Sequence, residues 1–196
     1  MGLREQNAAR TRQHIASAAM REFGERGYDA TTMEDVARGA EIGLSTLYRY
    51  FPTKEQLATA YLGDPSLMAD ALRARPADEP AEVAMGQALL NFIGLVASTP
   101  DEARIFGGIM EESSRVRARL LEWLGDVHVA LADALTDRQG LPTGDVGAAA
   151  EAWLAILVLQ QATLASDVDD PARAREQVVG VMRDLATRTI RSPRAE

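Results

Sequence analysis

The clearest structural signals in the chain lie in residues 31–57, TTMEDVARGAEIGLSTLYRYFPTKEQL. Thr31 and Thr32 are each followed three residues later by an acidic side chain. In this spacing the hydroxyl and the carboxylate can cap the first turn of a helix reciprocally. The pattern therefore predicts a short helix over residues 33–39.

The second half of the stretch predicts two more helix starts. A short helix is expected over residues 45–51, because Pro52 disfavours helical backbone in the residue before it. Thr53 then caps a further helix, and Gln56 three residues later is expected to complete a second capping box. Two short helices joined by a tight turn, resting on a longer helix expected over residues 7–26, form a helix-turn-helix unit. That first helix is expected to end at Gly27, with Tyr28 folded back on its end.

The helix expected over residues 45–51 has two different faces. At 100° per residue, Leu47 and Phe51 share one face, while Ser45, Thr46 and Arg49 gather on the opposite one. The helix is thus expected to be anchored by two apolar side chains and to present a small polar surface. Tyr48 and Tyr50 flank the two faces.

Composition and charge limit the class of protein. The chain has 196 residues, 46% of them hydrophobic, and no cysteine, which excludes disulfides and thiolate metal sites and suits the cytoplasm. The apolar run at residues 152–159 is too short to cross a bilayer, so no membrane partner is expected. Residues 1–54 carry a net charge of +1 and residues 55–196 a net charge of −9. Only the N-terminal quarter is therefore suited to approach a phosphate backbone.

The rest of the chain also shows helical spacing, and the fold class is expected to be all-α. The segment 63–65, Gly-Asp-Pro, is expected to break or kink the helix that starts after Thr53. Further helices are expected near residues 81–97, 101–110, 112–137, 144–166 and 171–191, separated by proline and glycine turns.

These motifs carry a family resemblance. The run from Thr31 to Ala37, followed by LYRYFPTKEQL at residues 47–57, resembles the DNA-binding domain of the TetR family of bacterial transcriptional regulators over residues 11–62. The resemblance implies about nine helices, with a DNA-binding domain at residues 1–54 and a ligand-binding and dimerisation domain at residues 55–196. It also implies a homodimer formed through the last two helices and a repressor that a small-molecule inducer releases from DNA.

The sequence departs from the family pattern in the turn between the two short helices. Family sequences generally carry glycine where this chain has Glu41, and serine or a similar cap where it has Gly43. A left-handed backbone at a residue other than glycine costs about 1 kcal/mol. We therefore expect the turn to be rearranged so that Gly43 supplies the unusual backbone angles.

Seven residues are candidates for contact with double-stranded DNA. The Arg49 guanidinium can donate two hydrogen bonds to guanine, and Ser45 and Thr46 either reach base edges or phosphate or only cap their helix. A cation in the first turn of a helix, as at Lys54, opposes the helix dipole and gains nothing locally, so a nearby phosphate is its expected partner. The tyrosines either bond phosphate or simply pack, and the resemblance favours phosphate for Tyr50. The full set is Thr32, Ser45, Thr46, Tyr48, Arg49, Tyr50 and Lys54.

The larger domain offers weaker signals. Large or polar side chains there can line an inducer cavity or belong to the core: Phe92, Phe106, Met110, Trp123, His128, Trp153 and Gln160. The segment 144–166 is apolar around most of its circumference, which predicts a buried helix. Together with the last helix it can close a subunit interface or pack within one protomer.

Three functions compete. A dimeric, ligand-responsive repressor that reads a pseudo-palindromic operator fits the motifs, and an activator fits them equally. An enzyme is disfavoured, because the only histidines are His14 and His128 and there is no glycine-rich phosphate loop or histidine-pair metal motif, so no catalytic residue, cofactor or metal is expected. A helical protein-interaction module is the remaining alternative, although the polar face and Lys54 favour DNA.

Overall fold

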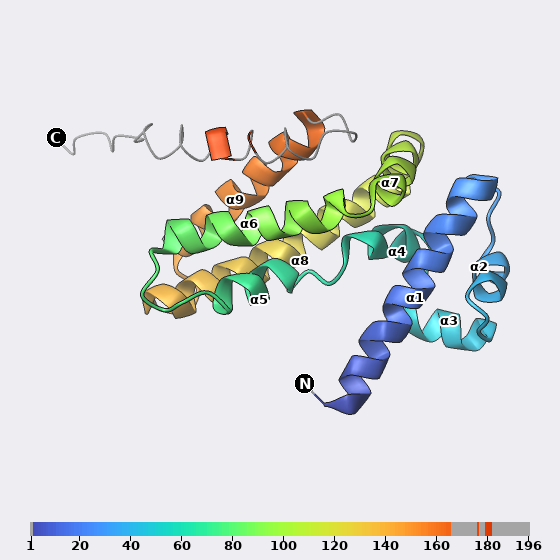
Figure 1. Cartoon of the computed structure of the whole chain (residues 1–196), viewed down its shortest axis with the longest axis horizontal. Coiled ribbons are helices and arrows are strands. Elements are labelled where there is room, and N and C mark those ends of the chain that lie inside the picture. The colour runs from blue at the N-terminus through green and yellow to red at the C-terminus, as the bar shows by residue number, and fades with distance from the viewer. Residues whose placement is uncertain (1, 166–175, 177–178, 182–196) are drawn as a thin grey trace. The chain divides into compact units, whose positions relative to one another are not determined.

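The computed structural model describes residues 2–165, 176 and 179–181, and within them the chain contains nine α-helices and no strand (Figure 1), which confirms the all-α prediction. The helices are α1 (Leu3–Arg26), α2 (Met33–Gly39), α3 (Leu44–Tyr50), α4 (Lys54–Thr59), α5 (Leu67–Arg73), α6 (Ala81–Ala97), α7 (Pro100–Glu112), α8 (Ser114–Gln139) and α9 (Val146–Ala165), with a 3₁₀ turn, η1 (Ala60–Leu62), after α4. The predicted helix at residues 171–191 falls mostly outside the described residues.

The break expected at residues 63–65 is present, and it divides the helix predicted to start after Thr53 into two. Gly63 follows η1 with φ 80° and ψ −167°, a backbone conformation that is essentially restricted to glycine. Its carbonyl accepts a hydrogen bond from the indole Nε1 of Trp123 at 3.0 Å. Helix α5 then starts at Leu67, so α4 and α5 are separate elements.

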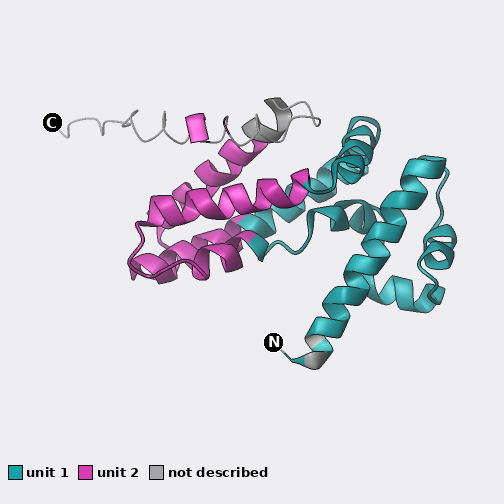
Figure 2. Ribbon diagram, viewed as in Figure 1, with its two compact units in different colours: residues 1–67, 98–127 teal, residues 68–97, 128–196 magenta. Residues whose placement is uncertain are grey.

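The chain divides into two compact units (Figure 2). One holds residues 1–67 and 98–127, and the other holds residues 68–97 and 128–196. Helix α7 and the first half of α8 thus belong with the N-terminal helices. The functional division at residue 54 that the sequence suggested stays a prediction.

The first unit has one hydrophobic core beneath the helix-turn-helix. Its side chains come from α1, α2, α3, α4 and the corner between α7 and α8, so segments more than 50 residues apart share one interior. The buried members from the helix-turn-helix and its supports include Ile15, Phe23, Val36, Leu47, Phe51, Leu57, Ile109 and Val116. Burial of this apolar surface holds the two short helices in place, since helices of seven residues are marginal alone.

The turn between α2 and α3 differs from the expectation. Glu41 itself adopts φ 54°, whereas Gly43 has φ −70° and ψ 144°, an ordinary extended conformation. The Ile42 N–H donates to the Ala37 carbonyl at 3.0 Å and the Glu41 N–H to the Arg38 carbonyl at 3.1 Å. These bonds form a Schellman motif with Glu41 at its left-handed position. The prediction that Gly43 supplies the unusual angles was therefore wrong, because these hydrogen bonds set the turn at Glu41.

The second unit packs α6 against α9, and α8 secures the loop before α6. The Arg138 guanidinium donates to the backbone carbonyls of Pro76 and Glu79, while Arg75 forms an ion pair with the Glu79 side chain. These contacts hold the loop at residues 74–80 to the end of α8.

Helix α9 is only partly buried, in contrast to the prediction of a buried helix. Ala148, Ala152, Ala155, Ile156 and Leu159 are buried in the second unit. The opposite face leaves four apolar side chains exposed within the chain: Val146, Trp153, Leu154 and Leu157. Within the part of the chain that the structure describes, one apolar face of α9 therefore stays exposed to solvent.

Candidate nucleic-acid interface

Helix α3 has the two faces that its sequence predicts. Leu47 is 0% exposed and Phe51, which directly follows the helix, is 1% exposed. On the other side Ser45 and Arg49 are exposed and Thr46 is half-buried. The helix is fixed through its apolar side and offers a guanidinium and two hydroxyls to solvent, which is the donor set that reads base edges and phosphates.

The two tyrosines of α3 differ in burial. Tyr48 is 45% exposed, whereas Tyr50 is half-buried and packs against the core of the first unit. The Arg49 guanidinium carbon lies 5.5 Å from the centre of the Tyr50 ring. Tyr50 thus packs against the core, which was one of its two predicted alternatives, and its ring supports the Arg49 side chain. A phosphate contact by either tyrosine stays a prediction.

Thr32 caps α2 as the sequence predicts. Its hydroxyl accepts a hydrogen bond from the Asp35 N–H at 3.1 Å, and its own N–H donates to the Asp35 carboxylate at 3.0 Å. The hydrogen bond from the Thr32 hydroxyl, followed by the one from its N–H, lowers the pKa of Asp35 to about 2. The capping box is therefore confirmed, and Thr32 has a structural role whether or not it also touches DNA.

Lys54 is not without local partners, and that part of the sequence argument was wrong. Its ammonium nitrogen lies 4.2 Å from the centre of the Tyr28 ring and donates to the Asp29 carbonyl at 3.4 Å. Burial lowers the pKa of Lys54, and the charges of Asp29 and Glu55 act in the opposite direction. The cation at the start of α4 is thus held by the turn that follows α1.

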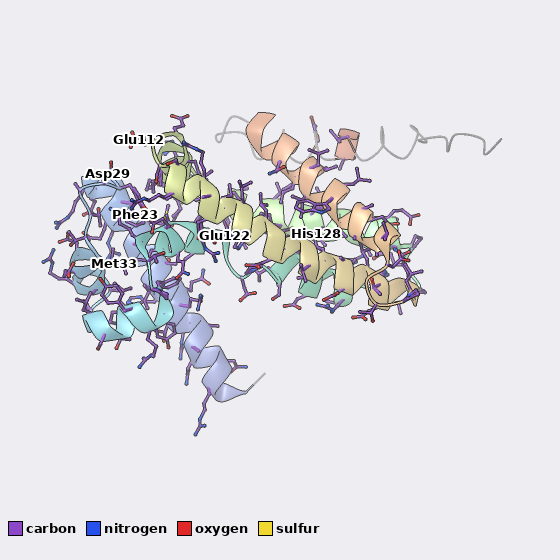
Figure 3. The ribbon with its side chains drawn as sticks, turned by 180° about the vertical axis from the view of Figure 1, so that it is seen from behind. Phe23, Asp29, Met33, Glu112, Glu122 and His128 are labelled. Carbon is purple, nitrogen blue, oxygen red and sulfur yellow. The ribbon has the colours of Figure 1, made fainter. Side chains whose placement is uncertain are left out.

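That turn is built by the end of α1. Gly27 has φ 84°, and its N–H donates to the Phe23 carbonyl at 2.9 Å. The chain reverses there, and the Tyr28 ring meets the Phe23 ring edge-on with centres 5.1 Å apart, so the predicted fold-back of Tyr28 is confirmed. Figure 3 marks Phe23 and Asp29 at this end of α1.

Tyr28 is the functional candidate that sequence reasoning missed. Its position after Gly27 predicted its contact with α1. Its contact with Lys54 joins residues 26 positions apart, and no local pattern indicates such a pair.

The proposed inducer-binding residues fall into two groups. Phe106 and Met110 pack against the core of the first unit, where the Tyr61 ring lies 5.6 Å from that of Phe106, and Trp123 bonds Gly63 in the same unit. The other four belong to the second unit: Phe92, His128, Trp153 and Gln160.

Within the second unit the structure pairs two of the candidates. The His128 and Trp153 rings are stacked with centres 4.3 Å apart, and the His128 Nε2 lies 3.0 Å from the Ala149 carbonyl. Phe92 is buried and Gln160 is half-buried. The role of all seven residues in ligand binding stays a prediction.

Comparison with known proteins adds a family to this geometry. The sequence model described as "Bacterial regulatory proteins, tetR family" matches residues 15–61, the segment from the middle of α1 to η1. This segment of the chain is similar to the DNA-binding part of the TetR family. Among curated relatives, the HTH-type transcriptional regulator TcmR of Streptomyces glaucescens is 35% identical over 97 residues, which are 48% of this chain and 42% of that protein. The HTH-type transcriptional repressor KstR of Mycobacterium tuberculosis is 42% identical over 52 residues, 26% of this chain and 24% of that protein.

The TetR resemblance extends in fold beyond the sequence match. A putative TetR-family transcriptional regulator from Syntrophomonas wolfei superposes with a TM-score of 0.68 at 16% identity, covering 92% of this chain and 97% of that one. This likeness shows the fold. In sequence, by contrast, the chain spans less than half the length of either curated relative. Both relatives are transcriptional regulators rather than enzymes, in agreement with the prediction that this chain is not an enzyme.

Among the described residues, no single helix is both long and apolar enough to span a membrane, although α6 and α7 pass that test when taken together.

Proposed function

We propose that this chain is a DNA-binding transcriptional regulator of the TetR family that acts in the cytoplasm as a dimeric repressor and is released from its operator by a small molecule. The observation that carries the proposal is the two-sided α3 helix, buried through Leu47 and Phe51 and exposed through Ser45 and Arg49, within the segment that matches the family. The choice of repression over activation follows the relative KstR, a transcriptional repressor.

In the proposed complex with DNA, different side chains have different roles. Arg49 on α3 reads a base edge in the major groove, where a bidentate contact to guanine discriminates by about 1–3 kcal/mol. Lys54 at the start of α4 binds a phosphate, which fixes the position of the protein without reading sequence. Of the other candidates, Thr32 caps the start of α2, and four lie on α3: Ser45, Thr46, Tyr48 and Tyr50.

The exposed side of α9 supports the dimer. Trp153, Leu154 and Leu157 are half-exposed apolar side chains on one helix, and a second copy of the chain would remove them from water. The last helix, which the sequence adds to this interface, lies largely outside the described residues. In a dimer two α3 helices about 34–36 Å apart would read successive major grooves of a pseudo-palindromic operator.

Release by an inducer is a shift between two conformers. A ligand that prefers the conformer with wrongly spaced α3 helices weakens operator binding in proportion to its differential affinity. The stacked His128 and Trp153 rings, with Phe92 and Gln160 in the same unit, are the candidates for ligand contact, and Phe106, Met110 and Trp123 belong to the unit that holds α3.

The test is DNA binding by the purified chain. Mobility shift across a salt series uses the DNA upstream of its own coding sequence and fragments selected from random oligonucleotides, with Arg49→Ala and Lys54→Ala beside the wild type. Arg49→Ala should weaken binding to selected DNA more than binding to unrelated DNA, and it should relax the preference at one base position. Lys54→Ala should weaken binding to both kinds of DNA alike and reduce the slope of log affinity against log salt by about one.

Arg104→Ala is the matched control, because it removes one exposed guanidinium from α7, outside the helix-turn-helix. It should leave sequence preference unchanged. If the wild type selects no DNA sequence, the regulator proposal is wrong and the interaction-module alternative replaces it.

A further inference from the structure

Lys54 is unusual in composition as well as in position. It is the only lysine among 196 residues, and the other 20 basic side chains are arginines. Its ammonium group is half-buried over an aromatic face, while its Asp29 hydrogen bond is long at 3.4 Å. The attraction between the cation and the negative face of the Tyr28 ring therefore acts together with the charges of Asp29 and Glu55 to compensate the ammonium for lost water.

The Tyr28 ring is itself held in place from two directions. The side chain is 9% exposed, and Phe23 of α1 meets the ring edge-on. On the other side, the Tyr28 hydroxyl lies close to the Ser113 side chain in the corner between α7 and α8, which acts to lower the pKa of Tyr28. Burial, with help from the charges of Glu55 and Asp29, raises the pKa of Tyr28 to about 12, so its hydroxyl stays protonated at neutral pH.

The corner between α7 and α8, which lies beside the Tyr28 hydroxyl, is also held in place by packing and hydrogen bonds. Ile109 and Val116, on either side of Ser113, are buried in the same core as Tyr28. The Arg117 guanidinium spans the corner and donates to the carbonyls of Met110 and Glu111 at 2.7 and 3.0 Å. The ring under Lys54 thus rests on a rigid base built from α1 and from the α7–α8 corner.

We propose that Tyr28 is a positioning residue for DNA binding: its fixed ring holds the ammonium group of Lys54 at the start of α4, where the group meets a phosphate of the DNA backbone. The inference rests on the proposed function, since it assigns a support to one of its phosphate contacts. A lysine side chain freed from the ring would have to be ordered when DNA binds, and we expect this cost to leave the phosphate contact unformed. A lysine already held over a ring loses less freedom on binding.

The choice of lysine over arginine fits this arrangement. An ammonium group is a compact charge with three donors, so it can lie on the ring and donate outward to a phosphate oxygen at the same time. A guanidinium is planar and stacks face to face on a ring, which turns its donors to its edges. Lys54→Arg should therefore keep the charge and yet bind DNA several-fold more weakly than the wild type.

The decisive experiment is a double-mutant cycle between Tyr28→Leu and Lys54→Gln, read as the salt dependence of binding to selected DNA. Each single variant should reduce the slope of log affinity against log salt by about 0.9, the value for one phosphate contact. The double variant should show no further reduction. Tyr28→Phe keeps the ring and loses the hydroxyl, and it should restore most of the slope that Tyr28→Leu loses.

Tyr28→Leu also removes packing from the core, so a matched destabilised variant is needed. Ile15→Val shortens a fully buried side chain of the same core and keeps both Tyr28 and Asp29, the neighbours of the Lys54 ammonium. Thermal unfolding should show both variants folded at the assay temperature. Ile15→Val should keep the wild-type salt slope, because lost stability alone does not remove a phosphate contact.

A second measurement needs no DNA. Because Lys54 is the only lysine, ¹³C-labelled lysine gives a single side-chain ε signal in the NMR spectrum. Ring current from Tyr28 should move its ε protons upfield in the wild type and in Tyr28→Phe, and they should return to the ordinary position in Tyr28→Leu.

The outcomes separate this inference from the proposed function. Failure of the wild type to select DNA would overturn both. If the wild type selects DNA while the Lys54 signal is ordinary, or while the two substitutions reduce the slope additively, the positioning role is wrong and the regulator proposal stands.

Discussion

The two short helices of the helix-turn-helix have the same length and opposite means of support. Helix α2 is seven residues long, opens on the Thr32–Asp35 capping box and closes on a Schellman motif at Glu41. Helix α3 is also seven residues long, but it follows Gly43, which makes no side-chain cap hydrogen bond, and it ends at Tyr50, two residues before Pro52. Local hydrogen bonds define the first helix, whereas the second depends on its contacts with the core.

The difference follows from what each helix has to present. The polar side chains at the start of α2 are used within the helix, where they satisfy backbone groups that have no helical partner. The polar side chains of α3 face away from Leu47 and Phe51, so they can face DNA. A recognition helix fixed from below by apolar side chains keeps its polar surface available, at the expense of local stability.

The largest effect should come from removing the anchor of α3. Leu47→Ala leaves a cavity at a 0% exposed site, and the free energy of unfolding should fall by about 2.7–5 kcal/mol. Val36→Ala is the matched change in α2, where fewer methyl groups are lost and the local caps remain, and it should cost about 2 kcal/mol. Urea unfolding of both variants measures the difference. Equal losses would show that α3 depends on its core contacts no more than α2 does.

The next effect concerns the cap of α2. Thr32→Ala removes the hydroxyl that accepts from the Asp35 N–H and should lower the free energy of unfolding by about 1 kcal/mol. Thr53→Ala is the matched control, because Thr53 caps α4 through a single bond to the Gln56 N–H at 3.2 Å without a capping box. Urea unfolding should show the smaller loss for Thr53→Ala, and a larger loss there would contradict a special role for the capping box.

The same cap makes stability depend on pH. The pKa of Asp35 is lowered from 3.8 to about 2 in the folded protein, so the carboxylate stabilises the fold fully above about pH 4. That contribution is lost as the pH falls through about 2. The stability difference between the wild type and Asp35→Asn should therefore be constant near neutral pH and shrink between pH 4 and pH 2, as followed by urea unfolding at each pH.

Much of the helix-turn-helix could be predicted because its signals are local. The Thr32–Asp35 spacing, the proline at position 52 and the periodicity of Leu47 and Phe51 each depend on residues no more than four positions apart. The boundaries of α2 and the faces of α3 followed from them. The predicted break at residues 63–65 was correct for the same reason.

Contacts between distant residues could not be predicted in this way. The partner of Lys54 is a ring 26 positions earlier, and the packing of Phe106 and Met110 under the helix-turn-helix joins residues more than 40 positions apart. Helical periodicity says which side chains share a face and nothing about which helix covers that face. The turn at Glu41 failed differently, because a glycine preference was treated as a requirement.

The turn itself offers the fourth prediction. Glu41 is exposed and has a left-handed backbone, which is strained for glutamate and which glycine adopts freely. Glycine loses more conformational entropy on folding, so the net gain of Glu41→Gly in the free energy of unfolding should be about 0.5 kcal/mol. Glu41→Ala removes the same carboxylate and keeps the strained backbone, so it should bring no gain. Paired urea titrations measure both, and an equal gain in the two variants would assign the effect to lost charge instead.

The smallest effect tests whether α3 can be given a side-chain N-cap like that of α2. Gly43 has an extended backbone, and a Cβ added there would meet only the Ser45 hydroxyl at 3.9 Å, so a side chain fits. Gly43→Ser supplies an oxygen that can accept from the Ser45 or Thr46 N–H and should raise the free energy of unfolding by a few tenths of a kcal/mol. Gly43→Ala, which restricts the unfolded chain without adding a cap, separates the two contributions. If serine stabilises no more than alanine in urea titrations, then α3 gains nothing from a cap, and its apolar anchors already fix where it begins.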